Sequence, residues 1–134
     1  MIRRLVLATL LLGLTGTGAE LLLVGHTEDP LQWTPLVLIL LCLIVLVWDG
    51  ISGSGASIRA LKATMVLFLI GGVFGLVVHW QGKIAFKREM DASLSGAKLF
   101  LEAMKSQSPP ALAPGIFVQM GILGLAYTST RSAK

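Results

Sequence analysis

Charged residues are scarce in this chain, and cysteine is almost absent. Of the 134 residues, 13% are charged, 54% are hydrophobic and one is cysteine. A single cysteine cannot form an internal disulfide, and one thiol is too few for a thiolate metal cluster. We therefore expect no disulfide framework, no metal site and no bound cofactor. Cys42 lies between two leucines and is interpreted as a small apolar packing residue.

Acidic residues are also few, at 7 against 11 basic ones, which leaves a net charge of +4. A basic chain can bind nucleic acid, but here the basic residues stand at the ends of apolar segments instead of forming one surface. Such flanks usually orient a membrane protein. We exclude nucleic acid as a partner and expect the lipid bilayer to be one.

The sequence contains no recognisable catalytic set. The hydroxyl residues are scattered, and neither histidine has a base or an orienting partner nearby in sequence. The glycine-rich connector at residues 50–57 is not a phosphate loop, because no Gly-Lys-Ser or Gly-Lys-Thr follows it. We predict that the protein is not an enzyme.

Four long apolar stretches are what the sequence does contain. They predict transmembrane helices over about residues 4–25, 31–49, 58–80 and 114–130, since about 20 apolar residues suffice to cross a bilayer. The predicted fold is a single all-α integral membrane domain, residues 1–134, built as a four-helix transmembrane bundle. The first stretch resembles a signal peptide at its start, but its apolar run resumes at Leu21–Val24, so we expect it to be retained.

The second stretch has a clear helix start. Asp29 is the expected N-cap, and Pro30 is the expected first helical residue. Gln32, the third helical residue, is expected to form a capping-box-like pair with Asp29. The stretch is nearly continuous Leu, Ile and Val, which predicts that this helix faces lipid or a partner.

One long interval, residues 81–113, separates the third and fourth stretches. Its charged run at residues 87–91 is interpreted as a solvated turn or, alternatively, as a docking surface. Residues 94–105 are expected to form a short amphipathic helix at the membrane surface, with Ala97, Phe100, Leu101 and Met104 on its apolar face. The proline-rich residues 108–115 should end this helix in a rigid bend.

Basic residues predict the orientation in the membrane. Arg3, Arg4, Arg59, Lys62, Arg131 and Lys134 favour cytoplasmic N- and C-termini, although five basic residues in the long interval oppose this. Small size and basic flanks suit a bacterial inner membrane.

Glu20 is the strongest candidate for a functional residue, because ionisable groups within a membrane span are costly and usually face the bundle interior or water. We place it about 8 Å from the outer end of its helix. The predicted intramembrane polar cluster joins Glu20 to Gln119 and His79. Small or polar residues are expected on the packing faces of three helices: Gly13, Gly16 and Thr17; Gly71 and Gly75; Gly121 and Gly124.

Two further polar groups have mainly structural interpretations. His26, Glu28 and Asp29 form a polar link at the outer face, but their spacing matches no metal motif. Asp49 is expected to cap the inner end of the second helix, with Arg59 or Lys62 as possible ion-pair partners.

These features favour a structural or accessory membrane protein that packs with partner subunits or with copies of itself. The alternative function is a small proton- or cation-coupled transporter that uses Glu20.

Overall fold

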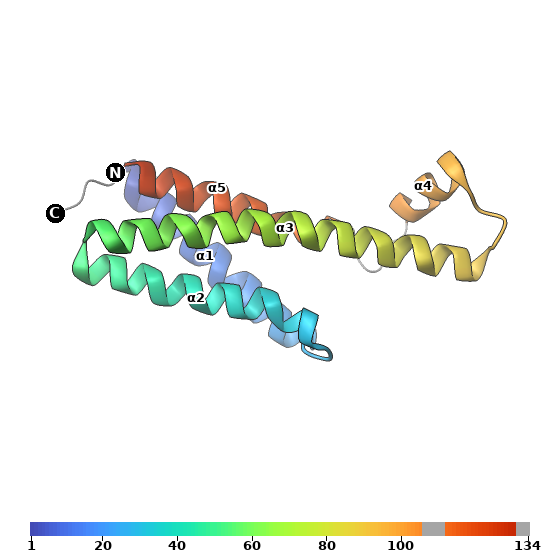
Figure 1. Ribbon diagram of the computed structural model, residues 1–134, viewed down its shortest axis with the longest axis horizontal. Coiled ribbons are helices and arrows are strands. Elements are labelled where there is room, and N and C mark those ends of the chain that lie inside the picture. The colour runs from blue at the N-terminus through green and yellow to red at the C-terminus, as the bar shows by residue number, and fades with distance from the viewer. Residues whose placement is uncertain (106–111, 131–134) are drawn as a thin grey trace.

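A computed structural model describes residues 1–105 and 112–130, and within these ranges the fold is entirely helical (Figure 1). The helices are α1 (Ile2–Leu23), α2 (Pro30–Ser52), α3 (Gly55–Met90), α4 (Gly96–Lys105) and α5 (Gly115–Ser129). Half of the predicted bend at residues 108–115, residues 108–111, lies outside the described residues, as do Arg131 and Lys134. Its described part, residues 112–114, is a turn that leads into α5.

Among the described residues, three helices are long and apolar enough to cross a membrane: α1, α2 and α3. The predicted assignment of the chain to a membrane rests on these helices and is confirmed to this extent. α5 occupies most of the fourth predicted stretch but has only 15 residues. Its length is about 22 Å at 1.5 Å per residue, which is less than the usual hydrocarbon thickness of about 30 Å.

α3 is much longer than predicted. It runs for 36 residues and ends at Met90, ten residues beyond Trp80. The charged run that we interpreted as a turn therefore belongs mainly to the last turn of this helix. No proline interrupts residues 55–90, and Lys, Arg, Glu and Met are good helix formers. The end of an apolar stretch therefore predicts where a helix could leave the membrane, but not where the helix itself ends.

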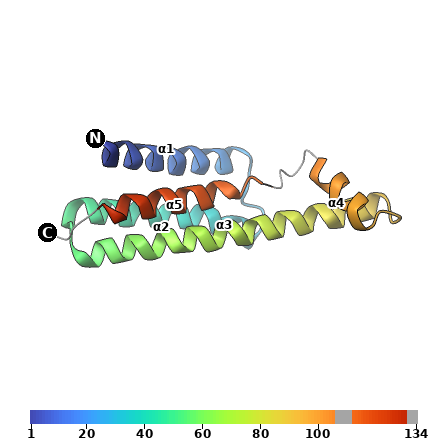
Figure 2. The ribbon, with the colours of Figure 1, turned by 90° about the horizontal axis from the view of Figure 1, so that it is seen from above.

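The helices run back and forth, so that α1 begins and α5 ends at the same end of the bundle (Figures 1 and 2). α5 packs against α3 and α1, and α2 packs against α3 and α1, whereas no Cα atom of α1 lies within 8 Å of one in α3. The C-terminal part of α3 extends past the other long helices and carries α4, which folds back against it.

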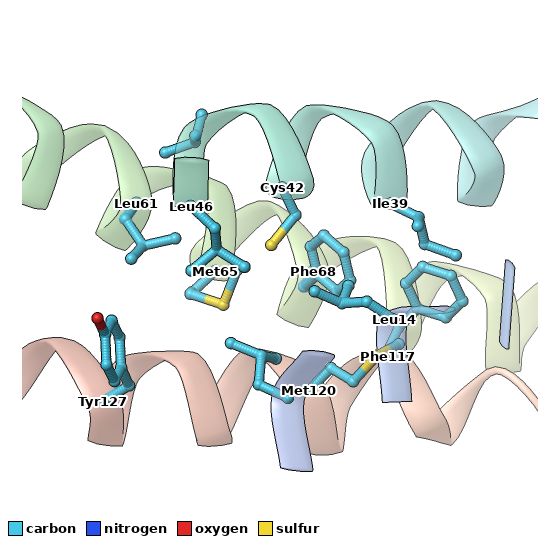
Figure 3. Close-up of a cluster of buried hydrophobic side chains, with 12 residues drawn as sticks. Leu14, Ile39, Cys42, Leu46, Leu61, Met65, Phe68, Phe117, Met120 and Tyr127 are labelled. Carbon is cyan, nitrogen blue, oxygen red and sulfur yellow. The ribbon is translucent and has the colours of Figure 1, made fainter. Parts of the chain in front are cut away.

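The core is formed by apolar side chains that meet between α2, α3 and α5 (Figure 3), with Leu10 and Leu14 from α1. Phe68 and Phe117 stack with ring centroids 5.2 Å apart. α2 contributes Ile39, Cys42, Val45 and Leu46 to this core. We predicted that this helix faces lipid or a partner; the structure buries one side of α2 in this core and leaves Leu40, Ile44 and Val47 exposed on the other. A uniformly apolar helix has no sequence pattern that marks its buried side.

Glycines allow α3 and α5 to approach closely. A Cβ atom at Gly72 would lie 2.8 Å from the backbone nitrogen of Val118, and one at Gly75 would lie 2.8 Å from Cβ of Pro114. On the opposite helix, a Cβ at Gly121 would lie 3.0 Å from the carbonyl oxygen of Met65, and Gly124 also faces the Met65 side chain. Because these helices touch backbone to backbone, this pair is the tightest in the fold.

The start of α2 confirms the predicted cap. The Asp29 carboxylate accepts hydrogen bonds from the backbone N–H groups of Leu31 (2.8 Å) and Gln32 (3.0 Å), and Pro30 is the first helical residue. The Gln32 side chain accepts from the N–H of Glu28 (2.8 Å), one residue before the position that a standard capping box would use.

Candidate functional site

The predicted polar cluster comes from three different helices. Glu20 is on α1 and Gln119 on α5, and both are exposed, whereas His79 on α3 is half-buried. The structure does not join Glu20 to His79 by a hydrogen bond or ion pair, and no Cα atom of α1 lies within 8 Å of one in α3. The Glu20 carboxylate also makes no hydrogen bond or ion pair with any residue in the described ranges.

Glu20 lies closer to the end of its helix than predicted. α1 ends at Leu23, so Glu20 is about 4.5 Å from that end at 1.5 Å per residue. Its face of α1 points outward: Leu12 and Leu23 are largely exposed, and a Cβ built at Gly16 meets nothing within 4 Å. The acidic side chain is therefore offered to the surroundings of the bundle and not to its interior.

The small residues of α1 divide between two faces. A Cβ at Gly13 would lie 3.3 Å from Sδ of Met120, so this glycine faces α5. Thr17 is half-buried, and Gly16 is exposed. On α3, Gly71 lies against Leu38 of α2, with 3.0 Å from a built Cβ to Cδ1. Gly72, which the sequence reasoning missed, has the closest backbone approach to α5.

The polar link between α1 and α2 serves the local fold. Asp29 caps α2, Glu28 is exposed, and His26 is half-buried. The indole N–H of Trp33 donates to the carbonyl oxygen of Thr27 (3.1 Å). Across residues 1–105 and 112–130, no group of three or more His, Cys, Asp or Glu side chains could hold a metal ion.

Asp49 is buried inside the bundle. The sequence had instead predicted that Asp49 caps the end of its helix at the membrane interface. It belongs to α2, is 1% exposed, and accepts a hydrogen bond from the hydroxyl of Ser57 on α3 (3.0 Å). Ser57 also donates to the carbonyl oxygen of Ser54, which is the N-cap of α3. Arg59 and Lys62, the expected partners, are both exposed. Because a buried carboxylate must be hydrogen-bonded, this pair joins α2 to α3 beside their connecting turn.

Two polar residues of α5 are buried toward the same end of the bundle. Tyr127 is 5% exposed, and its ring extends from α5 toward α2 and α3 (Figure 3). Thr128 is buried, and its hydroxyl donates to the carbonyl oxygen of Leu125. The sequence signal for a polar contact at this end was the serines of the connector at residues 50–57, together with Asp49 immediately before it.

A second buried charge holds α4 against α3. Lys83 is 2% exposed, and its Nζ donates to the carbonyl oxygen of Ala103 (3.4 Å). This carbonyl is in the last turn of α4, where backbone acceptors lack helical partners and a cation is favourable. Trp80 and Phe100 lie beside each other at the same contact, with ring centroids 5.1 Å apart.

The face that α4 buries against α3 is not the apolar face that we predicted to lie at the membrane surface. Leu99 and Ala103 are buried against α3, whereas Phe100, Leu101 and Met104 remain more than 40% exposed.

Beyond α3, hydrogen bonds from the hydroxyl (2.6 Å) and backbone N–H (2.9 Å) of Ser93 lower the pKa of Asp91, with a smaller contribution from the charge of Lys98.

Comparison with protein families, with curated proteins and with solved structures finds no match to this chain. Its function must therefore be argued from its own geometry. That geometry consists of a closely packed apolar interior, two buried polar contacts that join helices, and an outward-facing carboxylate on α1.

Proposed function

We propose that this chain is a structural or accessory integral membrane protein, which acts by packing with partner subunits or with copies of itself and has no catalysis of its own. The observation that carries the proposal is the exposure of α1. Only 11% of its most apolar 18-residue stretch is buried, against 28% in α3. This helix also turns Glu20 and Gly16 outward, where a second helix could meet them.

An unpaired carboxylate favours a protein neighbour over lipid. Ionisable side chains in membrane helices usually pair with another polar group, and small residues allow a second helix to approach closely. The outer face of α2 offers less: Leu40, Ile44 and Val47 are exposed there, and its exposed glycine, Gly50, stands in the last turn of the helix without a carboxylate beside it on that face. α1 is therefore the better surface for association.

The proposal includes four crossings, with α5 as the fourth. α5 packs along α3 in the opposite direction, from Pro114 beside Gly75 toward the end of the bundle where α2 and α3 are joined. A short apolar helix can be accommodated by local thinning of the bilayer or by association with neighbouring helices. Within this arrangement we propose a bacterial inner membrane, cytoplasmic N- and C-termini, and a surface position for α4.

The alternative, a cation-coupled transporter, requires Glu20 to line a water-filled path. In the single chain it points away from a core of large apolar side chains, including Phe68, Met65 and Met120. Such a path would have to form between copies. Uptake or expulsion of a cation by reconstituted vesicles, abolished by Glu20→Gln, would support this alternative.

The direct test is extraction in a mild detergent followed by sizing and native mass spectrometry. We expect a homo-oligomer or a stable complex with other membrane subunits. Gly16→Leu should weaken the assembly by obstructing the α1 surface, whereas Ile44→Leu on the exposed face of α2 should leave it unchanged. Recovery of an inert monomer in both detergent and lipid nanodiscs would contradict the proposal.

A further inference from the structure

Basic residues are almost evenly divided between the two ends of this bundle. Among the described residues, four belong to the end where α1 begins, and five to the opposite end, along the extension of α3 and on α4. The first group is Arg3, Arg4, Arg59 and Lys62; the second is Lys83, Lys87, Arg88, Lys98 and Lys105. Because an excess of Lys and Arg on one side sets the orientation of a membrane protein, this division gives little preference for either orientation.

The polarity of α1 favours an antiparallel neighbour. Arg3 and Arg4 stand in its first turn, and Glu20 stands near its last residue. In a parallel pair of α1 helices, two Glu20 carboxylates would meet at the negative ends of both helix dipoles. In an antiparallel pair, each carboxylate would lie beside the basic, positive end of the other helix.

The exposed face of α1 is also suited to this arrangement. Thr9, Leu12, Gly16 and Glu20 are exposed and follow one another at intervals of three or four residues, so they share a face. If two α1 helices align antiparallel with Ile2 opposite Leu23, Thr9 lies opposite Gly16. The side chain of one copy then meets the open space that the glycine of the other provides.

We propose that the partner of this chain is a second copy inserted in the opposite orientation, and that the two copies pack through the outer faces of their α1 helices. This inference rests on the proposed function and deepens it by naming the partner and the surface. This replaces the single orientation with cytoplasmic termini proposed above: one copy keeps its termini in the cytoplasm, and the other places them outside.

Orientation can be measured directly by labelling. In a Cys42→Ala background, Ala56→Cys places an exposed thiol at the α2–α3 turn, where a membrane-impermeant maleimide reacts only with copies that present this turn outside. We expect comparable labelled and protected fractions. The double variant Lys87→Gln/Arg88→Gln should make most copies protected, and Arg3→Gln/Arg4→Gln should make most copies reactive. A single orientation before these changes would overturn the proposal.

Cross-linking tests the contact itself. Copies carrying Thr9→Cys and copies carrying Gly16→Cys, with different tags and in the Cys42→Ala background, are produced together and oxidised in the membrane. We expect disulfides between the two variants and few within either one. The matched control Ile44→Cys, on the exposed face of α2, should form none.

The two proposals fail in different ways. Disulfides within each variant alone would indicate parallel α1 helices, which would overturn the antiparallel contact but leave self-association intact. A complex with an unrelated subunit and no cross-linking would overturn the inference while supporting the accessory function. A monomer in every assay would overturn both.

Discussion

The tightest helix contact provides the sharpest test of the fold. Gly72 of α3 faces α5, and a Cβ atom there would lie 2.7 Å from Cγ2 of Val118, 2.8 Å from its backbone nitrogen and 3.1 Å from Cβ of Phe117. Real side chains do not tolerate such distances, and the obstruction includes backbone. Gly72→Ala must therefore push α3 and α5 apart along the interface that holds the core.

The magnitude follows from two opposing effects. Alanine favours a helix over glycine by up to about 1 kcal/mol, whereas overpacking a close interface costs about 1–3 kcal/mol. Gly82, on the same helix, provides a matched control because a Cβ there meets nothing within 4 Å. Gly82→Ala should therefore be neutral or slightly stabilising, and Gly72→Ala should lower the free energy of unfolding.

The assay is reversible unfolding in mixed micelles, followed by tryptophan fluorescence and by helical circular dichroism. We expect the midpoint of Gly72→Ala to move to lower denaturant concentration, and that of Gly82→Ala to remain or to rise. Equal midpoints for the two variants would refute the close approach of α3 and α5.

Three further predictions concern individual polar contacts. Ser57→Ala should lower the free energy of unfolding by about 1–3 kcal/mol in the same assay, because it removes a donor from the buried carboxylate of Asp49; a change of a few tenths would contradict the contact. Lys83→Met should speed backbone hydrogen exchange in α4 without a comparable change in α2, since it removes a cation from the last turn of α4. An exchange rate in α4 equal to that of the unchanged protein would argue against this role. Ser93→Ala should raise the pKa of Asp91, measured by carboxyl NMR, toward its usual 3.8. Because the folded pKa is lowered, the stability from Asp91 is present above the unfolded pKa and is lost as the pH falls through the folded value; an unchanged pKa in the variant would contradict the hydrogen bonds.

Local patterns in the sequence predicted much of the helical architecture. Runs of apolar residues located the three long membrane helices, and the sequence Asp29-Pro30-Leu31-Gln32 predicted the start of α2, including its N-cap. These features depend on residues that are close together in the sequence, so they can be predicted without knowledge of the fold.

The orientation of each helix about its axis was less predictable. Glu20 was expected inside because polar groups are costly in lipid, but which face of α1 is buried depends on the fact that α5 and α2, and not α3, are its neighbours. The same limitation affects α2, whose apolar residues provide no contrast between a buried and an exposed side.

Contacts across a turn were missed for a related reason. Asp49 and Ser57 are eight residues apart on different helices, and Lys83 and Ala103 are 20 apart. Neither pair has a sequence spacing that distinguishes it from unrelated polar residues. Whether the two residues of a pair meet depends on where the helices begin and end. The end of α3 was not predictable from its apolar stretch, because the helix continues to Met90.

The central claim is that the outer face of α1 is a surface for association in the membrane. The most direct measurement is Förster transfer between donor- and acceptor-labelled copies in lipid vesicles as the ratio of protein to lipid is varied. For association between copies, we expect saturable transfer, weakened by Gly16→Leu on α1 and unchanged by Ile44→Leu on α2. Transfer no greater than that of randomly distributed monomers at every ratio, with no other membrane protein bound to α1, would contradict it.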